Sequence, residues 1–338
     1  MYEGFYQLKE NPFRLSPDPG FMCMTIQHQE ALSGLVYTVC TRSGLTVLMG
    51  EAGTGKTTLL YSLLGLLEKR RFYTAMCTNP TLTREEFYDL LMLKFGVDCK
   101  STLKSRQLAA LEETLRRNQA DGRPSILIVD EAQRLSAELL EEVRLLLNME
   151  TPRQKLLEII ISGQPELGDV LNRTELRQLR QRVSCICRLT PLSLHEAGEY
   201  ISHRLAKAGL PGQTLFSDQT IALIHQHSGG IPRLINTLCD GCLRGGFALQ
   251  TRLITAAVVE EAVKDLEIGL TPPVAMLRPQ FTDADTATPE LVTQNHATHS
   301  IPHNGNGLLS GGHAPLETYA ARQKSVNFFS NLMDRWRQ

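Results

Sequence analysis

Apolar residues follow two different rhythms along the first 190 residues. Uninterrupted apolar runs, such as residues 47–49 and 126–129, alternate with stretches in which apolar residues recur at helical spacing, such as Leu108, Leu111 and Leu115. Runs of the first kind are typical of parallel strands that are buried on both faces. The alternation predicts an α/β fold, a parallel sheet with helices on both faces. The predicted strands cover residues 47–49, 71–77, 125–129, 156–161 and 183–187.

From Ser193 onward the pattern contains helices only, which indicates a small all-α domain. Ser193 and Glu196 form a capping box, Ser217 caps the next helix, and further helices are expected near Pro232 and over residues 255–266. The sequence therefore predicts an N-terminal segment, a core and a helical lid, at residues 1–45, 46–191 and 192–268.

The composition shifts after the predicted lid. Residues 269–315 are rich in Thr, Asn, Gly, Pro and His without a sustained period, so we expect a disordered tract. Residues 316–338 regain apolar side chains at helical spacing, which predicts a C-terminal amphipathic helix. The pattern leaves open whether that helix docks on its own domain, binds a protein partner or lies on an anionic membrane surface.

The overall composition is that of an ordinary globular protein, because 42% of the residues are hydrophobic and 21% are charged. The net charge of -1 argues against a general basic surface for nucleic acid, although four arginines fall between residues 173 and 182. No apolar run of about twenty residues occurs, and the N-terminus does not read as a secretory signal. We therefore expect no transmembrane segment and a cytoplasmic location, with peripheral contact at the inner membrane left open.

Two cysteine pairs raise the question of a zinc site. Cys185 and Cys187 are two residues apart, and Cys239 and Cys242 form a C-x-x-C pair within a predicted helix. Four thiolates would suit zinc, but the first spacing is shorter than structural zinc sites use. The pattern favours buried free thiols.

The stretch from Gly50 to Thr58 matches a phosphate-binding loop. It fits G-x-x-x-x-G-K-[ST] and stands between a predicted strand and a predicted helix, the context that this motif requires. Glycines let successive N–H groups face one concavity, Lys56 supplies a positive charge, and the Thr57 hydroxyl can ligate Mg²⁺. The predicted phosphate-binding residues are Gly50, Glu51, Ala52, Gly53, Thr54, Gly55, Lys56, Thr57 and Thr58.

Polar residues end two further predicted strands. Asp130 and Glu131 directly follow residues 125–129, at the carboxyl end where open α/β sheets bind ligands. Asp130 is expected to meet Mg²⁺ together with Thr57, and Glu131 can orient or deprotonate a water. Gln164 follows the strand that begins near residue 156, where it either contacts the γ-phosphate or the attacking water, or forms a plain turn.

The order of these motifs resembles that of the AAA+ ATPases. More narrowly, the sequence is similar to the secretion-pathway ATPase family typified by general secretion pathway protein A and ExeA, over about residues 1–268. The likeness is carried by MYEGFY at 1–6, NPF at 11–13, PDP at 17–19, HQEAL at 28–32, GQPEL at 163–167 and GGIPRLIN at 229–236.

The resemblance implies an Mg²⁺-dependent ATPase with Walker A and Walker B motifs at the loop and at the acidic pair. It makes Gln164 the sensor one residue and Arg233 the sensor two residue on the lid. Arg182 becomes the arginine finger that reaches a neighbouring subunit's nucleotide, with Arg180 as the alternative, so hydrolysis is expected to need a homo-oligomer. Residues 13–32 are expected to cover the adenine.

The family also implies work in assembly or export at the bacterial cell envelope, in a secretion, pilus, polysaccharide or exosortase-associated system. The partner would be an envelope protein held by the lid or by the C-terminal helix. Members often carry a membrane span and a peptidoglycan-binding module, and this sequence shows neither, which favours a cytoplasmic member. Two alternatives stay open: a DNA-associated ATPase of the transposition-regulator type, although a nucleic-acid partner is not favoured, and a nucleotide-gated scaffold.

Overall fold

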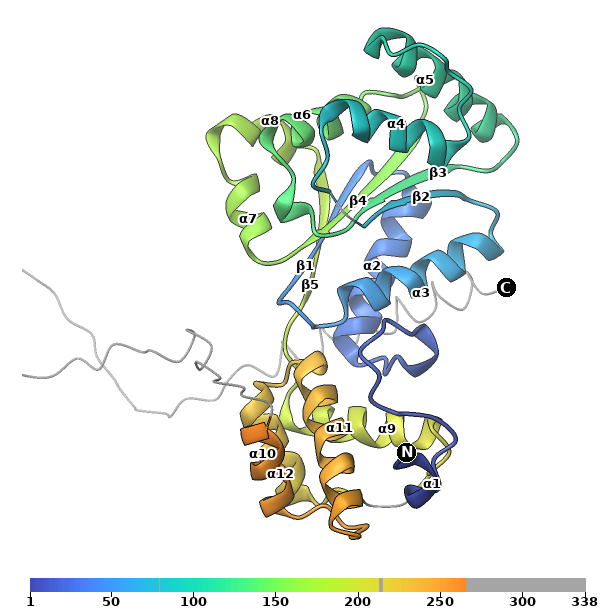
Figure 1. The fold of residues 1–338 in the computed structure, drawn as a ribbon. Helices are drawn as coiled ribbons and strands as arrows, with labels where there is room; N and C mark the ends of the chain where they lie inside the picture. The colour runs from blue at the N-terminus through green and yellow to red at the C-terminus, as the bar shows by residue number, and fades with distance from the viewer. Residues whose placement is uncertain (79, 213–214, 266–338) are drawn as a thin grey trace, which may run out of the picture.

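The computed structural model describes residues 1–78, 80–212 and 215–265. These residues form two lobes, an upper lobe built on a sheet and a lower lobe of helices (Figure 1). The predicted disordered tract at residues 269–315 and the predicted helix at residues 316–338 lie outside the described residues.

Within the described residues, five strands form one parallel sheet in the order β2-β3-β4-β1-β5. The strands are β1 (Leu45–Gly50), β2 (Tyr73–Cys77), β3 (Ser125–Val129), β4 (Leu157–Gly163) and β5 (Val183–Leu189). Every residue of β1, β3 and β4 is buried, which explains their uninterrupted apolar runs. The predicted α/β fold is confirmed.

Helices cover both faces of the sheet. One face packs against α2 (Ile26–Thr41) and α3 (Lys56–Lys69), and the other packs against α4 (Arg84–Phe95), α5 (Lys104–Ala120), α6 (Ala137–Leu146), α7 (Glu166–Leu171) and α8 (Arg177–Arg180). Side chains alternate along each strand, so Ile159 and Ile161 belong to one core and Ile160 to the other.

The lower lobe has a hydrophobic core of its own. It contains α9 (Leu194–Lys207), α10 (Asp218–Ser228), α11 (Pro232–Ala248) and α12 (Ala256–Asp265). Ser193 and Glu196 form the expected capping box, and the Ser217 side chain accepts from the Thr220 N–H at the start of α10. α11 begins with a proline at its first position, where the missing N–H costs nothing.

The N-terminal segment is shared between the two lobes. The short helix α1 (Glu3–Tyr6) belongs to the lower lobe, where Tyr2, Tyr6 and Phe13 are part of its core, and η1 (Pro19–Phe21) contacts both α9 and α3. In Figure 1 α1 accordingly lies in the lower lobe, where the Phe5 ring contacts Phe247 of α11, whereas α2 flanks the sheet. Residues 1–45, grouped as one segment from the sequence, therefore join the lid at one end and the sheet at the other.

A few boundaries differ from the prediction. The second strand begins at Tyr73 rather than at residue 71, because Arg71 has a φ of 62° and lies in the left-handed region after α3. α5 begins at Lys104, before the apolar spacing that marked its start at residue 107. The arginine-rich stretch forms only two single turns, η3 (Thr174–Leu176) and α8.

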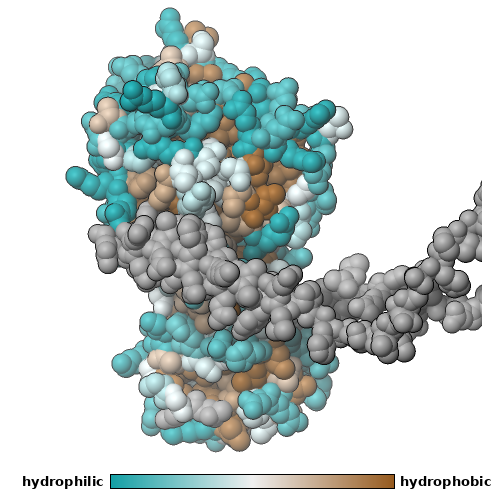
Figure 2. Space-filling model, turned by 180° about the vertical axis from the view of Figure 1, so that it is seen from behind, coloured by the Kyte–Doolittle hydropathy of each residue, from teal (hydrophilic) through white to brown (hydrophobic). Residues whose placement is uncertain are grey.

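Seen from behind, the upper lobe has a mostly hydrophilic surface, with hydrophobic residues gathered toward its lower half (Figure 2). In the described part of the chain, none of the helices combines the length and the apolar character that crossing a bilayer requires.

Glu158, on the central strand β4, has a buried carboxyl group. Its Oε2 accepts a hydrogen bond of 2.7 Å from the Gly44 N–H, and Oε1 has no partner among the described residues. Burial raises the pKa of Glu158 to about 7, against the opposing effects of the Gly44 hydrogen bond and the positive charges of Arg42 and Lys155.

This shift predicts a pH-dependent stability. The folded protein holds a proton on Glu158 that the unfolded chain releases, so the unfolding free energy falls as the pH rises from about 4.5 through about 7. Glu158→Gln removes this titration. The unfolding free energy of the variant, relative to that of the wild type, should therefore be about 3 kcal/mol higher at about pH 8 than at about pH 4. Urea unfolding at both pH values measures this gain. The exposed Glu68→Gln is the control, and an equal difference from wild type at both pH values would contradict the expectation.

Candidate functional site

The loop between β1 and α3 wraps around the Lys56 side chain. Its ammonium group donates hydrogen bonds of 2.7 Å to the Gly50 carbonyl and 3.0 Å to the Glu51 carbonyl. The Thr54 hydroxyl also donates to the Glu51 carbonyl, at 2.9 Å. Burial lowers the pKa of Lys56, while the carboxylates of Glu131, Asp130 and Glu51 act in the opposite direction. The Lys56 ammonium group is thus held in place by carbonyl groups of the phosphate loop itself.

Asp130 is fixed at the end of β3 by three hydrogen bonds. Its backbone N–H donates to the Cys77 carbonyl at 2.9 Å, and its Oδ1 accepts from the Glu131 N–H at 3.0 Å. Its Oδ2 accepts from the Thr57 hydroxyl at 2.7 Å. A hydroxyl and a carboxylate are the oxygen ligands that Mg²⁺ prefers, so these two side chains fit the metal predicted from the sequence.

Glu131 and Gln164 lie just beyond the carboxyl ends of the neighbouring strands β3 and β4. Glu131 follows β3 with a φ of 55°, a left-handed conformation that few residues other than glycine adopt. Gln164 follows β4, and its backbone N–H donates to the Gln133 side chain at 3.1 Å. Both residues are half-buried, and both line a cavity between the sheet and the lid.

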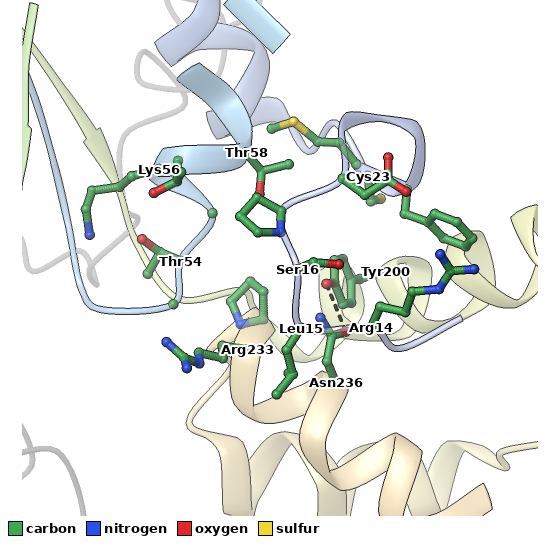
Figure 3. Close-up of a pocket in the computed structure, with 18 of the residues that line it drawn as sticks. Arg14, Leu15, Ser16, Cys23, Thr54, Lys56, Thr58, Tyr200, Arg233 and Asn236 are labelled. Atoms are coloured by element: carbon green, nitrogen blue, oxygen red, sulfur yellow. Dashed lines mark hydrogen bonds between the residues drawn. The ribbon is translucent and has the colours of Figure 1, made fainter. Parts of the chain in front are cut away.

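A cavity of about 360 Å³ lies between the phosphate loop of the upper lobe and the lid. Its walls come from four parts of the chain: the N-terminal loop, the phosphate loop from Ala52 to Thr58, the two strand ends, and the lid. Figure 3 shows Lys56, Thr54 and Thr58 on one side, with Arg233 and Asn236 across from them. Gly50 and Glu51 do not line it, and instead hold Lys56 from behind.

The lid touches the phosphate loop at the start of α11. The Arg233 backbone N–H donates to the Gly53 carbonyl at 3.2 Å, and the Arg233 side chain is exposed at the cavity. Gly53 has a φ of 84°, and a Cβ built there would lie 2.7 Å from the Arg233 Cβ. Only glycine permits this close approach without displacing the lid.

Sequence reasoning gave no individual role to three lid residues that line the cavity. Arg204 is buried and donates to the Pro12 carbonyl at 2.5 Å and to the Tyr200 hydroxyl at 2.9 Å. The Tyr200 hydroxyl in turn donates to Asn236 Oδ1 at 3.0 Å, the dashed line in Figure 3. The helices that carry these polar residues were identified from the spacing of their apolar residues, which says nothing about a polar role. Their burial at the cavity is visible only in the structure.

His28 was likewise part of a motif without a role of its own. Burial lowers the pKa of His28 and so favours the neutral ring, while the hydrogen bond to the Thr54 carbonyl acts in the opposite direction. The Thr54 carbonyl lies 3.4 Å from Nε2 and can only accept, so Nε2 carries the proton and Nδ1 accepts from the Thr25 hydroxyl at 2.7 Å. His28 thereby ties α2 to the phosphate loop.

The two candidate finger arginines lie outside the cavity. Arg182 is exposed and donates to Asn148 Oδ1 at 3.1 Å, and Arg180 is exposed and donates to Asn172 Oδ1 at 3.0 Å. Neither reaches the phosphate loop of its own chain.

The cysteine pairs lie in different places. Cys239 and Cys242 are buried in the core of the lid, whereas Cys185 and Cys187 lie on β5 against the core formed with α2. The four thiols therefore do not form one site, and the described residues bring together no cluster of three His, Cys, Asp or Glu side chains suited to a metal.

Comparison with known proteins identifies relatives of this chain. Residues 40–171 match the family model described as AAA domain. Over 249 residues, which are 73% of this chain and 45% of the relative, the chain is 39% identical to General secretion pathway protein A of Aeromonas hydrophila. The chain thus spans less than half the length of that relative.

Solved structures show the same fold at low identity. Cdc6p from Pyrobaculum aerophilum has a TM-score of 0.61 at 16% identity, covering 76% of this chain and 73% of its own. Drosophila ORC bound to DNA has a TM-score of 0.55 at 17% identity, covering 72% and 66%. At such identities the likeness concerns the fold alone. The AAA domain at residues 40–171 and the 39% identity to General secretion pathway protein A place this chain among the AAA-domain relatives of that protein.

Proposed function

We propose that this protein binds ATP with Mg²⁺ in the cavity between its lobes and hydrolyses it to ADP and phosphate. The observation that carries the proposal is the 2.7 Å hydrogen bond between Thr57 and Asp130, at the foot of a phosphate loop that already encloses a lysine. A hydroxyl from the first turn of α3 and a carboxylate from the end of β3 converge there, where the metal of a bound triphosphate would be needed.

The phosphates are bound by the loop and by the first turn of α3. Residues 52–58 line the cavity, and the positive end of the α3 dipole there favours anions. Lys56 adds its charge for the outer phosphates. Mg²⁺, held by Thr57 and Asp130, would neutralise charge on the β- and γ-phosphates.

Hydrolysis is assigned to the strand ends and the lid. Glu131 accepts the proton of the attacking water as general base, and Gln164 contacts the γ-phosphate or that water. The Arg233 side chain binds the phosphates from the lid, because the Arg233 backbone N–H is already hydrogen-bonded to the phosphate loop. The N-terminal loop near residues 14–23, which lines the cavity, covers the base.

A neighbouring copy of the chain completes the site in this proposal. Arg182 and Arg180 are both exposed, and neither lines the cavity of its own chain. This is the placement expected of an arginine that acts on the nucleotide of another subunit. The relative's name refers to the general secretion pathway. We therefore infer that a homo-oligomer of this ATPase serves secretion or related export at the cell envelope, with its envelope partner bound outside the cavity.

Lys56→Ala should weaken binding of Mg²⁺ and ATP by a factor on the order of 10² or more, because it removes a buried charge from the phosphates. Isothermal titration calorimetry measures the change. The matched control is Lys69→Ala, an exposed lysine at the other end of α3. Equal affinities for the wild type and Lys56→Ala would exclude the proposed site.

Glu131→Gln should lower kcat for ATP hydrolysis by about 10²–10⁴-fold while nucleotide affinity is kept, because a neutral amide cannot take the proton of water. Phosphate release and calorimetry give the two quantities, with the exposed Glu138→Gln on α6 as the control. A variant that hydrolyses at the wild-type rate would remove Glu131 from the mechanism.

Arg182→Ala should abolish the rise of specific activity with protein concentration, leaving the rate roughly 10³–10⁵-fold below that of the assembled wild type. Binding of nucleotide by the dilute protein should not change. Arg180→Ala decides between the two arginines, and Arg116→Ala on α5 is the control. If both finger candidates keep the concentration dependence, neither acts in trans.

A further inference from the structure

Gln133 joins the two catalytic strand ends through its side-chain amide. Its Nε2 donates to Glu131 Oε2 at 2.7 Å, and its Oε1 accepts from the Gln164 backbone N–H at 3.1 Å. Gln133 itself lies on the short 3-10 helix η2 (Ala132–Arg134), immediately after β3. A single side chain therefore bridges the ends of β3 and β4.

The chemistry of the two partners fixes the orientation of this amide. A carboxylate only accepts and a backbone N–H only donates, so the NH₂ end must face Glu131 and the oxygen must face Gln164. The flipped amide would set its oxygen against the carboxylate and its NH₂ against the N–H, and would lose both hydrogen bonds.

The local backbone is shaped for this contact. Glu131 takes its left-handed conformation at the start of η2, and the next residue, Ala132, is fully buried in the core beneath the sheet end. This sharp turn sends Gln133 back toward Glu131. Strain of this kind, about 1–3 kcal/mol per residue, persists only where the surroundings hold it in place.

Gly163 leaves room for the other half of the bridge. A Cβ built at this last residue of β4 would lie 2.7 Å from Gln133 Oε1 and 2.9 Å from Leu167 Cδ2. Any larger residue would push the amide away from the Gln164 N–H. The absence of a side chain at residue 163 thus permits the bridge.

The bridge acts on a carboxylate that faces the cavity. Glu131 lines the cavity, and among the carboxylates that favour the charged form of Lys56 its effect is the largest. Gln133 occupies Oε2, so Oε1 stays available for a water. Because the Gln133 amide also holds Gln164, displacement of one strand end is carried to the other.

We propose that Gln133 is a positioning residue that orients the Glu131 carboxylate toward the attacking water and couples it to Gln164. This inference rests on the proposed ATPase function. Contact between Gln164 and a γ-phosphate then aligns Glu131 in the same event, which ties the activation of water to the presence of a triphosphate.

The test removes the amide in two ways. Gln133→Met keeps the length of the side chain without its hydrogen bonds, and Gln133→Ala removes the side chain beyond Cβ without overpacking. Each should lower kcat roughly 10- to 100-fold, the scale of a misplaced reacting group, while the affinity for Mg²⁺ and ATP is kept. Gln219→Met, at an exposed position on α10, is the matched control.

A second measurement needs no hydrolysis. In the nucleotide-free full-length protein, hydrogen exchange of the Gln164 amide should be faster in both Gln133 variants than in the wild type or the control, because that N–H loses its acceptor. In a Glu131→Gln background, Gln133→Met should lower kcat no further, since its effect acts through Glu131.

The outcomes separate this inference from the proposed function. Wild-type kcat in both Gln133 variants, or a loss that persists in full in the Glu131→Gln background, overturns the positioning role and leaves the ATPase proposal intact. A rise in KM alone overturns it as well. A wild type that binds nucleotide without hydrolysing it overturns the ATPase proposal and this inference together.

Discussion

The hydrogen bond between the Thr57 hydroxyl and the Asp130 carboxylate is the contact on which the site depends. It joins the helix that follows the phosphate loop to the end of β3, which is not a direct neighbour of β1 in the sheet. The contact forms because all the described strands are parallel and their carboxyl ends meet at one edge. Residues that are more than seventy positions apart in the chain are thus brought together at one edge of the sheet.

The same edge explains why the site needs two lobes. The sheet supplies the loop, the acids and Gln164, but the opposite walls come from α9, α11 and the N-terminal loop. Arg204 holds that loop to the lid through the Pro12 carbonyl, and Tyr200 passes the connection on to Asn236. The N-terminal loop and the lid therefore share one core and are expected to move together over a bound nucleotide.

Polar contacts hold the side chains of the acidic pair, Asp130 and Glu131, in place. The phosphate loop grips its own lysine, Asp130 is held by backbone and hydroxyl groups, and Gln133 ties Glu131 to the end of β4. Lys56, Asp130 and Glu131 each have a hydrogen-bond partner, as polar groups in a site of low dielectric require. The protein makes these contacts by itself, which is the kind of preorganisation that the proposed reaction would use.

The sequence by itself determined the α/β fold, the two-rhythm pattern of strands and helices, and the positions of the phosphate loop and the acidic strand end. These follow from local chemistry, because burial on both faces demands apolar runs, and a glycine bend before a helix demands particular residues. Only the tertiary structure decided that residues 1–45 divide between the lobes, that Arg204 and Tyr200 face the cavity, and that Gln133 links Glu131 to Gln164. The reason is that these contacts join residues distant in sequence or depend on one strained turn, and neither leaves a periodic trace in the chain.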